Sequence, residues 1–336
     1  MIDTKVFSMA PFYLCHDLLT GMHPEAARTC LTLAAAHLGG LEDKSVFHVG
    51  AGCGTELFTS VRFGCGSISG IDINPEQVEM FKLVCEGGAG KIYGILEQDP
   101  IASKLYPVTY LSEAAAIASG LPILKPRPTK NLLTYQVADF FSCDLNGVSS
   151  GGNVDAVICN VAFHWLVQKR YFVNVVLERM AEFLGPGGIA VVSVPFHFLD
   201  LEDRREEEYK RSHCFYRTNI YHGFHDWLCR CLMVNGQKVT DNTRFEKVQG
   251  LAMSEVDLLS GSEHMSCVGA TNFFYTPIEY SVANVLRGLG LFEAMHLTTL
   301  PGTEVVQAVA RAATQIYDTS ETFGTYVYYF AYRKNE

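Results

Sequence analysis

Residues 46–56 read VFHVGAGCGTE, a short apolar run followed by three glycines at alternate positions, Gly50, Gly52 and Gly54. Glycine adopts backbone conformations that other residues avoid, and it lets a ligand approach the main chain closely. A loop of this kind after a strand is therefore typical of a turn that bends around a bound group. A plain turn between a strand and a helix has the same composition.

The spacing of the glycines narrows the choice of ligand. The dinucleotide fingerprint is G-x-G-x-x-G, whereas this chain has G-x-G-x-G, and Thr55 stands where the third dinucleotide glycine would be. A phosphate-binding P-loop ends in Gly-Lys followed by Ser or Thr, and this chain lacks that ending. The loop thus disfavours both of these ligands, and it leaves a different bound group or a plain turn.

The chain around this loop alternates strands and helices. The predicted helices cover 23–38, 56–64, 76–86 and 168–184, and the predicted strands cover 45–49, 67–73, 132–141, 154–163 and 188–196. Such alternation predicts an α/β fold with a Rossmann-like, doubly wound and mostly parallel sheet. Two late strand-like stretches, 292–300 and 325–334, bring the sheet to seven strands and predict an antiparallel strand at its edge.

Two stretches do not fit the alternation. Residues 86–131 are too long for a simple connection between a helix and a strand, and residues 197–275 open with a charged run and then become aromatic. We predict a cofactor-binding core over 1–196 and 276–336, with 86–131 as an insertion in it. Residues 197–275 are predicted to form a helical and aromatic substrate-binding cap, because long loops at the carboxyl ends of parallel strands can cover a ligand.

The ends of the next two strands carry groups that suit an adenosine. Asp72 lies 18 residues after Gly54, where a carboxylate can accept both hydroxyls of a ribose, and Ile73 offers an apolar face to the base. Asp139 and Phe140 end the third strand, where the carboxylate suits the amino group of adenine and the ring suits its plane. Each acid alone could be a helix cap or a surface residue, but three successive strand ends with suitable groups favour an adenosine site.

The bulk composition excludes some classes of function. The 336 residues are 48% hydrophobic and carry a formal net charge of −10, which disfavours a non-specific grip on nucleic acid. No apolar run is long enough to span a bilayer and no signal peptide is evident, so we expect a cytoplasmic protein with no membrane contact. The 11 cysteines are then expected to be reduced thiols. Cys229 and Cys231 lack the second pair that a zinc site needs, and no metal is predicted.

Together these segments resemble the class I S-adenosylmethionine-dependent methyltransferases, over about residues 20–196 and more weakly over the last sixty. The matching pieces, in chain order, are VFHVGAGCGTE, SGIDINPEQVE, YQVADFF, VDAVICNVAFHWL and FLGPGGIAVVSVP. The resemblance implies that the methionine part of S-adenosyl-L-methionine approaches the loop residues Gly50, Ala51, Gly52 and Gly54. It also implies that Asp72 binds the ribose, that Asp139 and Phe140 hold the adenine, and that Asn160 lies near the transferred methyl group.

One residue departs from the pattern of the family. The family often carries Asp or Glu at the position of His48, where the carboxylate helps to position the amino group of the methionine part. A histidine provides no fixed negative charge, so Glu56, just beyond the glycines, is expected to take over part of that role. His48 is otherwise expected to be a strand residue that is hydrogen-bonded to backbone. Whether His48, Glu56 or water meets the amino group stays open at this stage.

The chemistry expected of the family is a displacement, in which most of the catalysis can come from holding the reacting atoms in line in a water-poor site. The fourth strand ends in Asn160-Val161-Ala162-Phe163, without the N-P-P-[YF] of DNA-adenine and protein-glutamine enzymes. The following His164 and Trp165 resemble small-molecule enzymes of the family. We predict His164 as a general base or an orienting donor and Trp165 as a wall of the acceptor pocket, with packing as the alternative for both.

The predicted cap adds an acceptor pocket that suits a flat ring or an amine, lined by Tyr221, His222 and Trp227. The expected partner is thus a small-molecule acceptor, methylated at O or N, such as an aromatic, amine or carboxylic-acid metabolite. The chain is expected to be a monomer or a homodimer. Two other functions stay open, namely different chemistry on the same fold, such as aminopropyl transfer, and a non-catalytic partner subunit that binds the cofactor.

Overall fold

The structure, a computed structural model, describes residues 22–52, 54–86, 133–148, 152–170, 172–195, 198–200, 233–234, 237–238, 253–275 and 325–336. The insertion predicted over 86–131 lies outside the described residues apart from Glu86. Most of the predicted cap and the strand-like stretch 292–300 also lie outside them.

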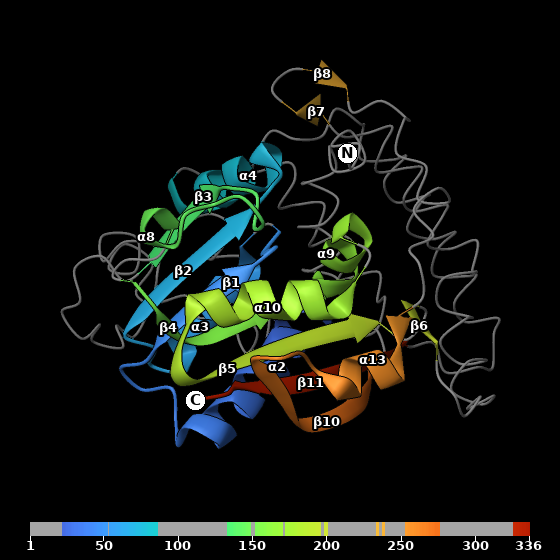
Figure 1. Cartoon of the computed structure of the whole chain (residues 1–336). Coiled ribbons are helices and arrows are strands. Elements are labelled where there is room, and N and C mark those ends of the chain that lie inside the picture. The colour runs from blue at the N-terminus through green and yellow to red at the C-terminus, as the bar shows by residue number, and fades with distance from the viewer. Residues whose placement is uncertain are drawn as a thin grey trace.

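A seven-stranded sheet forms the centre of the described part, in the order β10-β11-β5-β4-β1-β2-β3 (Figure 1). Its strands are β1 (Ser45–Val49), β2 (Ser67–Asp72), β3 (Leu133–Val137), β4 (Val154–Cys159), β5 (Leu184–Pro195), β10 (Met265–Tyr275) and β11 (Thr325–Lys334). Strands β1 to β5 pair in parallel, whereas β11 runs antiparallel to both β5 and β10. The predicted fold class, a mostly parallel, Rossmann-like sheet with an antiparallel addition at one edge, is confirmed.

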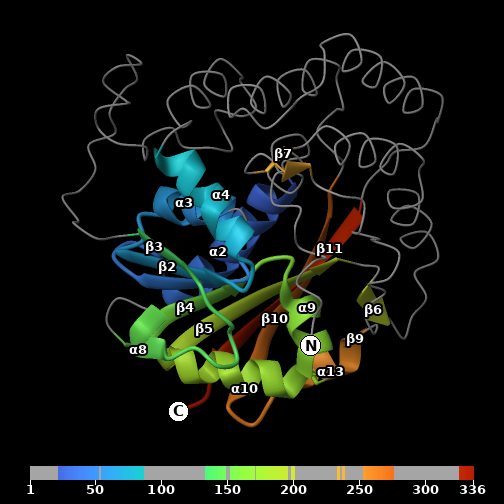
Figure 2. The same cartoon turned by 90° about the horizontal axis from the view of Figure 1, so that it is seen from above.

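Helices cover both faces of this sheet, as parallel strands require (Figure 2). One face carries α2 (Met22–Leu38), α3 (Thr55–Arg62) and α4 (Pro75–Glu86), and the other carries α8 (Leu145–Val148), α10 (Val173–Phe183) and α13 (Glu255–Ser260). Helix α9 (Phe163–Arg170) follows β4 and packs on α10 and β5. Four two-residue strands complete the described elements, β6 (Leu199–Asp200), β7 (Met233–Val234), β8 (Gln237–Lys238) and β9 (Met253–Ser254).

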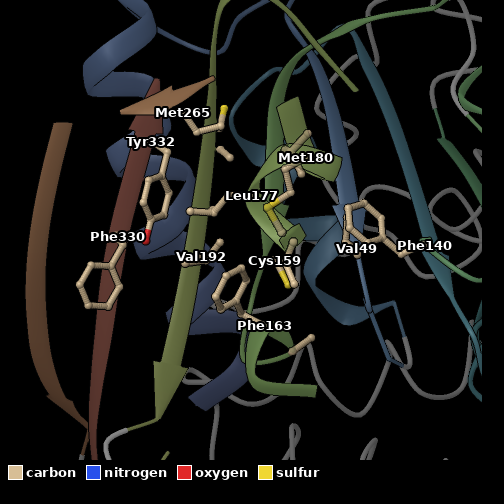
Figure 3. Close-up of a cluster of buried hydrophobic side chains, with 14 of the residues drawn as sticks. Val49, Phe140, Cys159, Phe163, Leu177, Met180, Val192, Met265, Phe330 and Tyr332 are labelled. Carbon is tan, nitrogen blue, oxygen red and sulfur yellow. The ribbon is translucent and has the colours of Figure 1, made fainter. Parts of the chain in front are cut away.

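Apolar side chains fill the space between the sheet and α10 (Figure 3). On β1, the ring of Phe47 stacks on Phe183 of α10 with the ring centroids 4.9 Å apart. Successive side chains of a strand point to opposite faces, so the next residue, His48, faces α3 instead. The alternation along β1 thus puts an apolar ring into the core on one face and an imidazole under the first turns of α3 on the other.

The outer strand β10 corrects the predicted boundary of the cap, because Met265–Tyr275 lies within the segment 197–275 and yet belongs to the main sheet. Residues 327–332 of β11 are all buried, so this strand is apolar on both of its faces. A strand of that kind lies in the interior of a sheet and needs a partner at each edge. Its second partner is β10, so β11 itself is not the edge.

Other boundaries also differ from the prediction, and strand β4 ends at Cys159 where residue 163 was expected. The helix expected over 168–184 is two helices, because α9 ends at Arg170 and α10 runs from Val173 to Phe183. Strand β3 ends at Val137, earlier than the expected residue 141, so Asp139 and Phe140 lie in the loop that follows it.

Candidate functional site

The glycine loop lies where the strand order of the sheet reverses. Strand β1 pairs with β2 on one side and with β4 on the other, and the chain turns back across this point. In open α/β sheets such a switch point forms a crevice beyond the carboxyl ends of the strands, where ligands bind. The N–H groups of Gly50 and Ala51 both donate to the carbonyl of Ile71, over 2.9 and 3.2 Å, so the loop is tied to the end of β2.

The three glycines of the loop all have a left-handed backbone, with φ of 69° at Gly50, 55° at Gly52 and 75° at Gly54. A methyl group on Gly54 would lie 2.3 Å from the ring of Phe81, so packing within the protein requires that glycine. At Gly52 no protein atom of the described residues lies within 4 Å of such a methyl group. The loop therefore presents an open face of main chain at Gly52, whose carbonyl accepts a hydrogen bond from the Tyr135 hydroxyl.

Asp72 closes the loop from the end of β2. Its carboxylate accepts the N–H of Gly52 over 2.9 Å and the N–H of Asn74 over 2.8 Å. Each carboxylate oxygen has a further lone pair, so both can also accept the hydroxyls of a ribose. Burial raises the pKa of Asp72 to about 6, and the charge of Glu56 also raises it. The N–H donors of Asn74 and Gly52 act in the opposite direction and lower this pKa. The neighbouring Ile73 is partly exposed beside this carboxylate.

Asp139 organises the loop after β3. Its carboxylate accepts the N–H of Phe141 and the hydroxyl of Ser142, each over 3.3 Å, and its carbonyl accepts the N–H of Cys143 over 2.9 Å. The side chain is partly exposed at the same edge of the sheet as Asp72. It thus combines a local turn-forming role with a position that suits the adenine contact predicted for it.

The ring of Phe140 lies in the core. It is 3% exposed and stacks on Phe183, with the centroids 5.4 Å apart. The predicted packing of this ring on an adenine finds no support in that arrangement. Arg179 of α10 donates to the carbonyls of Phe140 and Cys143, and its guanidinium lies 4.7 Å from the centroid of Phe183. This arginine therefore fastens the loop after β3 to the helix beneath it.

A chain of buried polar side chains runs beneath the glycine loop, on the face of the sheet that α2 and α3 cover. Its members come from four elements and their ends, namely His48, Glu56, Ser60, Asn160 and Ser193. The Nδ1 atom of His48 lies 2.8 Å from one carboxylate oxygen of Glu56, and the Nδ2 of Asn160 donates to the other over 2.9 Å. The Ser193 hydroxyl donates to the Oδ1 of Asn160 over 2.9 Å. Every carboxylate oxygen of Glu56 thus has a protein partner.

His48 bonds to side chains. Its Nδ1 meets Glu56, its Nε2 lies 2.6 Å from the Ser60 hydroxyl, and its ring is fully buried. The expectation of a strand histidine bonded to backbone is therefore wrong. Because a carboxylate only accepts, the pairing assigns the Nδ1 proton to the bond with Glu56, and the Ser60 hydroxyl can donate to Nε2 of the neutral ring or accept from the imidazolium.

The chain takes a strained turn directly after β4. Val161 has a φ of 52°, in the left-handed region that β-branched residues rarely enter. Its N–H donates to the Ser193 hydroxyl over 2.7 Å, and that hydroxyl in turn donates to Asn160. Strain of this kind, of order 1–3 kcal/mol, persists only where the surrounding structure holds it. The polar chain under the glycine loop therefore also holds the turn that leads to α9.

His164 and Trp165 lie in the first turn of α9, just past this strained turn. His164 is 3% exposed, and its ring stacks on Phe198 with the centroids 3.8 Å apart. The Trp165 ring is partly buried, 4.9 Å from that of His164. The two rings and Phe198 thus form an aromatic cluster after β4, which is compatible both with packing and with a wall of the acceptor pocket.

Several predicted residues lie outside the described part of the chain. They are the cap residues Tyr221, His222 and Trp227, together with Cys229 and Cys231. Among the described residues, no group of three or more His, Cys, Asp or Glu could hold a metal ion, and no helix is long and apolar enough to cross a bilayer. The described buried thiols are protonated, because burial raises the pKa of Cys65 to about 12 and that of Cys159 well above its usual value.

Three site residues were missed by reasoning from the sequence, namely Ser60, Arg179 and Ser193. Ser193 had a usable signal, since it is a lone hydroxyl in the otherwise apolar strand segment IAVVSVP. Ser60 had a weaker one, because it lies one helical turn after Glu56 and so on the same face of α3. Arg179 gave no signal, because a charged residue on an amphipathic helix usually faces solvent.

No protein-family model and no curated protein sequence matches this chain. Solved structures match this chain at low sequence identity. One is a methyltransferase from Thiobacillus denitrificans bound to S-adenosyl-L-homocysteine, which is 16% identical to this chain. The match covers 91% of each chain and has a TM-score of 0.41. Coclaurine N-methyltransferase matches at 10% identity over 92% of this chain and 72% of its own, with a TM-score of 0.39. A mycolic acid cyclopropane synthase matches at 13% identity over 90% of this chain and 82% of its own, with a TM-score of 0.42.

The strand order assigns the fold, and these likenesses by themselves assign no activity to the chain. The chain has a seven-stranded, mostly parallel α/β sheet of the Rossmann-like type with an antiparallel addition at one edge.

Proposed function

We propose that the chain is an S-adenosylmethionine-dependent methyltransferase that acts on O or N of a small molecule, such as an aromatic, amine or carboxylic-acid metabolite. The observation that carries the proposal is the pairing of Gly52 with Asp72. An open, left-handed stretch of main chain is bonded to a partly buried carboxylate at the switch point of the sheet. We take the protein to be cytoplasmic and a monomer or homodimer.

The roles of the individual residues follow from their positions at the carboxyl ends of the strands. Gly50, Ala51 and Gly52 offer main chain to the methionine part, and Asp72 can accept the ribose hydroxyls while it keeps its bonds to Gly52 and Asn74. Asp139 stands at the corresponding edge of β3 for the amino group of the base. The cofactor, when bound, supplies the electrophilic methyl group.

The acceptor side is formed by the chain after β4. Asn160 and the turn at Val161 fix the start of α9, and His164 and Trp165 follow there. In this proposal His164 takes a proton from the acceptor or orients it, and the surrounding rings exclude water. Because in-line displacement depends mainly on alignment, a rigid turn between the cofactor side and the acceptor side contributes directly to the rate.

The test of the function is a titration of the protein with S-adenosyl-L-homocysteine by calorimetry. Wild type is expected to bind, and Asp72→Ala is expected to bind at least about tenfold more weakly, a change of about 1.4 kcal/mol. Asp257→Ala, which removes an exposed carboxylate on α13, serves as the control and is expected to bind like wild type. Equal affinity of wild type and Asp72→Ala would contradict the assignment of the ribose carboxylate.

The co-product separates the proposal from its alternatives. Incubation with S-adenosylmethionine and a set of candidate acceptors is expected to release S-adenosylhomocysteine, which mass spectrometry identifies. Release of methylthioadenosine would instead indicate transfer of the amino-acid-bearing propyl group, and a parallel incubation with decarboxylated S-adenosylmethionine tests for aminopropyl transfer itself. Binding of S-adenosylmethionine by wild type without release of either co-product would support a non-catalytic partner subunit that binds the cofactor, and no binding at all would contradict the proposed function.

A further inference from the structure

The candidate site contains buried negative charge that no lysine or arginine of the described residues neutralises. Glu56 is 4% exposed, and it lies near enough to Asp72 for its charge to raise the pKa of that carboxyl. Within the described part of the chain, lysine and arginine form ion pairs at Asp155 and Glu182, and neither pair involves Glu56 or Asp72. Among the residues that the structure describes, the basic group bonded to Glu56 is the imidazole of His48.

The charges of Glu56, Asp72 and His48 together determine which kind of ligand group the site favours. With a neutral His48, the carboxylates of Glu56 and Asp72 give this part of the site two negative charges. With a protonated His48, one negative charge is left. Buried charge that has no counterpart is strongly unfavourable, so in either state the charges of the described residues favour a cation beside Glu56. The amino-acid part of S-adenosylmethionine carries a primary ammonium group, which is a cation that can also donate three hydrogen bonds.

Glu56 is placed to meet that ammonium group. It lies in the first turn of α3, directly after the glycine loop, and it bonds to Asn160 at the end of β4. It therefore lies between the two strands that flank the switch point. Its bonds with His48 and Asn160 use one lone pair on each oxygen, and a carboxylate has about four acceptor positions. Acceptor positions thus stay available after both protein bonds are made.

We infer, on the basis of the proposed function, that the Glu56 carboxylate receives the ammonium group of the cofactor and that His48 is a positioning residue that holds this carboxylate. In this chain the carboxylate comes from the start of α3 and not from the end of β1. The imidazole of His48, at the end of β1, bonds to this carboxylate and fixes its position. A glutamate has three side-chain torsions, so two fixed donors remove freedom that binding would otherwise have to restrict.

The two side chains that bond to Glu56 are themselves held in place. His48 lies on the central strand β1, and the Ser60 hydroxyl fixes its far nitrogen. The second donor to Glu56, Asn160, is held by Ser193 of β5. One donor to Glu56 is thus on strand β1, and the other directly follows β4 and is held by the neighbouring strand β5. Sites that are held on rigid elements keep their geometry better than sites on loops.

The test compares two probes that differ in the amino-acid part, S-adenosyl-L-homocysteine, which has the ammonium group, and methylthioadenosine, which lacks it. Glu56→Gln keeps the shape of the side chain and removes its charge. We expect this variant to lose at least about tenfold in affinity for S-adenosylhomocysteine in calorimetry and to keep its affinity for methylthioadenosine. Equal losses for both probes, or no loss for either, would overturn the inference.

His48 is tested by two replacements. Asparagine places its amide near the Nδ1 position and can still donate to Glu56, whereas leucine cannot. We expect His48→Leu to lose affinity for S-adenosylhomocysteine alone, and His48→Asn to restore most of it. Ser60→Ala, which removes only the bond to Nε2, is expected to have a smaller effect than His48→Leu. Equal affinities of the asparagine and leucine variants would overturn the positioning role.

The same measurements separate failure of this inference from failure of the proposed function. If wild type binds neither probe, the proposed function falls and the inference falls with it. If wild type binds both probes and the variants treat them alike, only the inference is wrong. If Glu56→Gln binds neither probe because it does not fold, the asparagine and leucine variants of His48 decide the question.

Discussion

Replacing Gly52 with alanine distinguishes a ligand-binding loop from a plain turn. Gly52 has a φ of 55°, and an L-residue with a side chain there costs roughly 1–2 kcal/mol. Apart from the chain neighbours of Gly52, no described atom lies within 4 Å of the added methyl group, so the described part of the chain adds no steric term to this strain. Gly187→Ala is the matched control, because Gly187 has a φ of 69°, is equally unobstructed and lies near the start of β5, at the opposite end of the sheet.

Both variants are therefore expected to lower the unfolding temperature by the same few degrees in a thermal scan. Only Gly52→Ala brings a methyl group into the space that the cofactor is proposed to occupy. In calorimetry it is expected to weaken S-adenosylhomocysteine binding by at least about tenfold, whereas Gly187→Ala binds like wild type. If the two variants bound the cofactor product equally well, the open face at Gly52 would not be a binding surface.

Three further perturbations test other parts of the site. Ribose hydroxyls donate to the ionised form of Asp72, whose pKa is raised from 3.8 to about 6. The affinity for S-adenosylhomocysteine should therefore fall about tenfold from pH 6.5 to pH 5 and level off at higher pH. The same pH profile in the Asp72→Asn variant would contradict this. Arg179→Ala removes two charge-assisted hydrogen bonds to the loop after β3. The variant should therefore have a free energy of unfolding in denaturant that is lower by roughly 3 kcal/mol. An unchanged midpoint of the denaturant transition would show that the loop does not depend on α10. His164→Ala should lower turnover by about a hundredfold or more and leave cofactor affinity nearly intact, whereas equal effects on both would make His164 a packing residue.

The parts of the fold that depend on local pattern could be predicted from the sequence. Apolar strands, a glycine loop and acids at strand ends follow short-range rules, and the structure places Asp72 where those rules expect it. The position of β10 could not be predicted in this way, because strand neighbours are chosen by long-range pairing. Phe140 shows a second limit, since an aromatic residue after a strand suits either the core or a ligand, and only packing against Phe183 decides between them.

The role assigned to His48 rests on its hydrogen bond to Glu56, which lies eight residues further along the chain, on the other side of the glycine loop. The sequence put His48 and Glu56 near the same ligand group, but their mutual bond follows from the sharp turn of that loop. The bond from Asn160 to Glu56 joins residues 104 positions apart, and pattern reasoning on one chain gives no access to such a pair.

The interior position of β11 has a consequence for how the protein is made. A ribosome releases the chain from the N-terminus onward, so β5 and β10 are both complete before β11 is available to join them. Until then β5 has one open edge, and β10 has no neighbour in the main sheet among the described residues. The nascent chain thus exposes an unpaired apolar strand edge for the time needed to translate the residues up to Lys334, and this interval is when self-association and chaperone capture are most favoured.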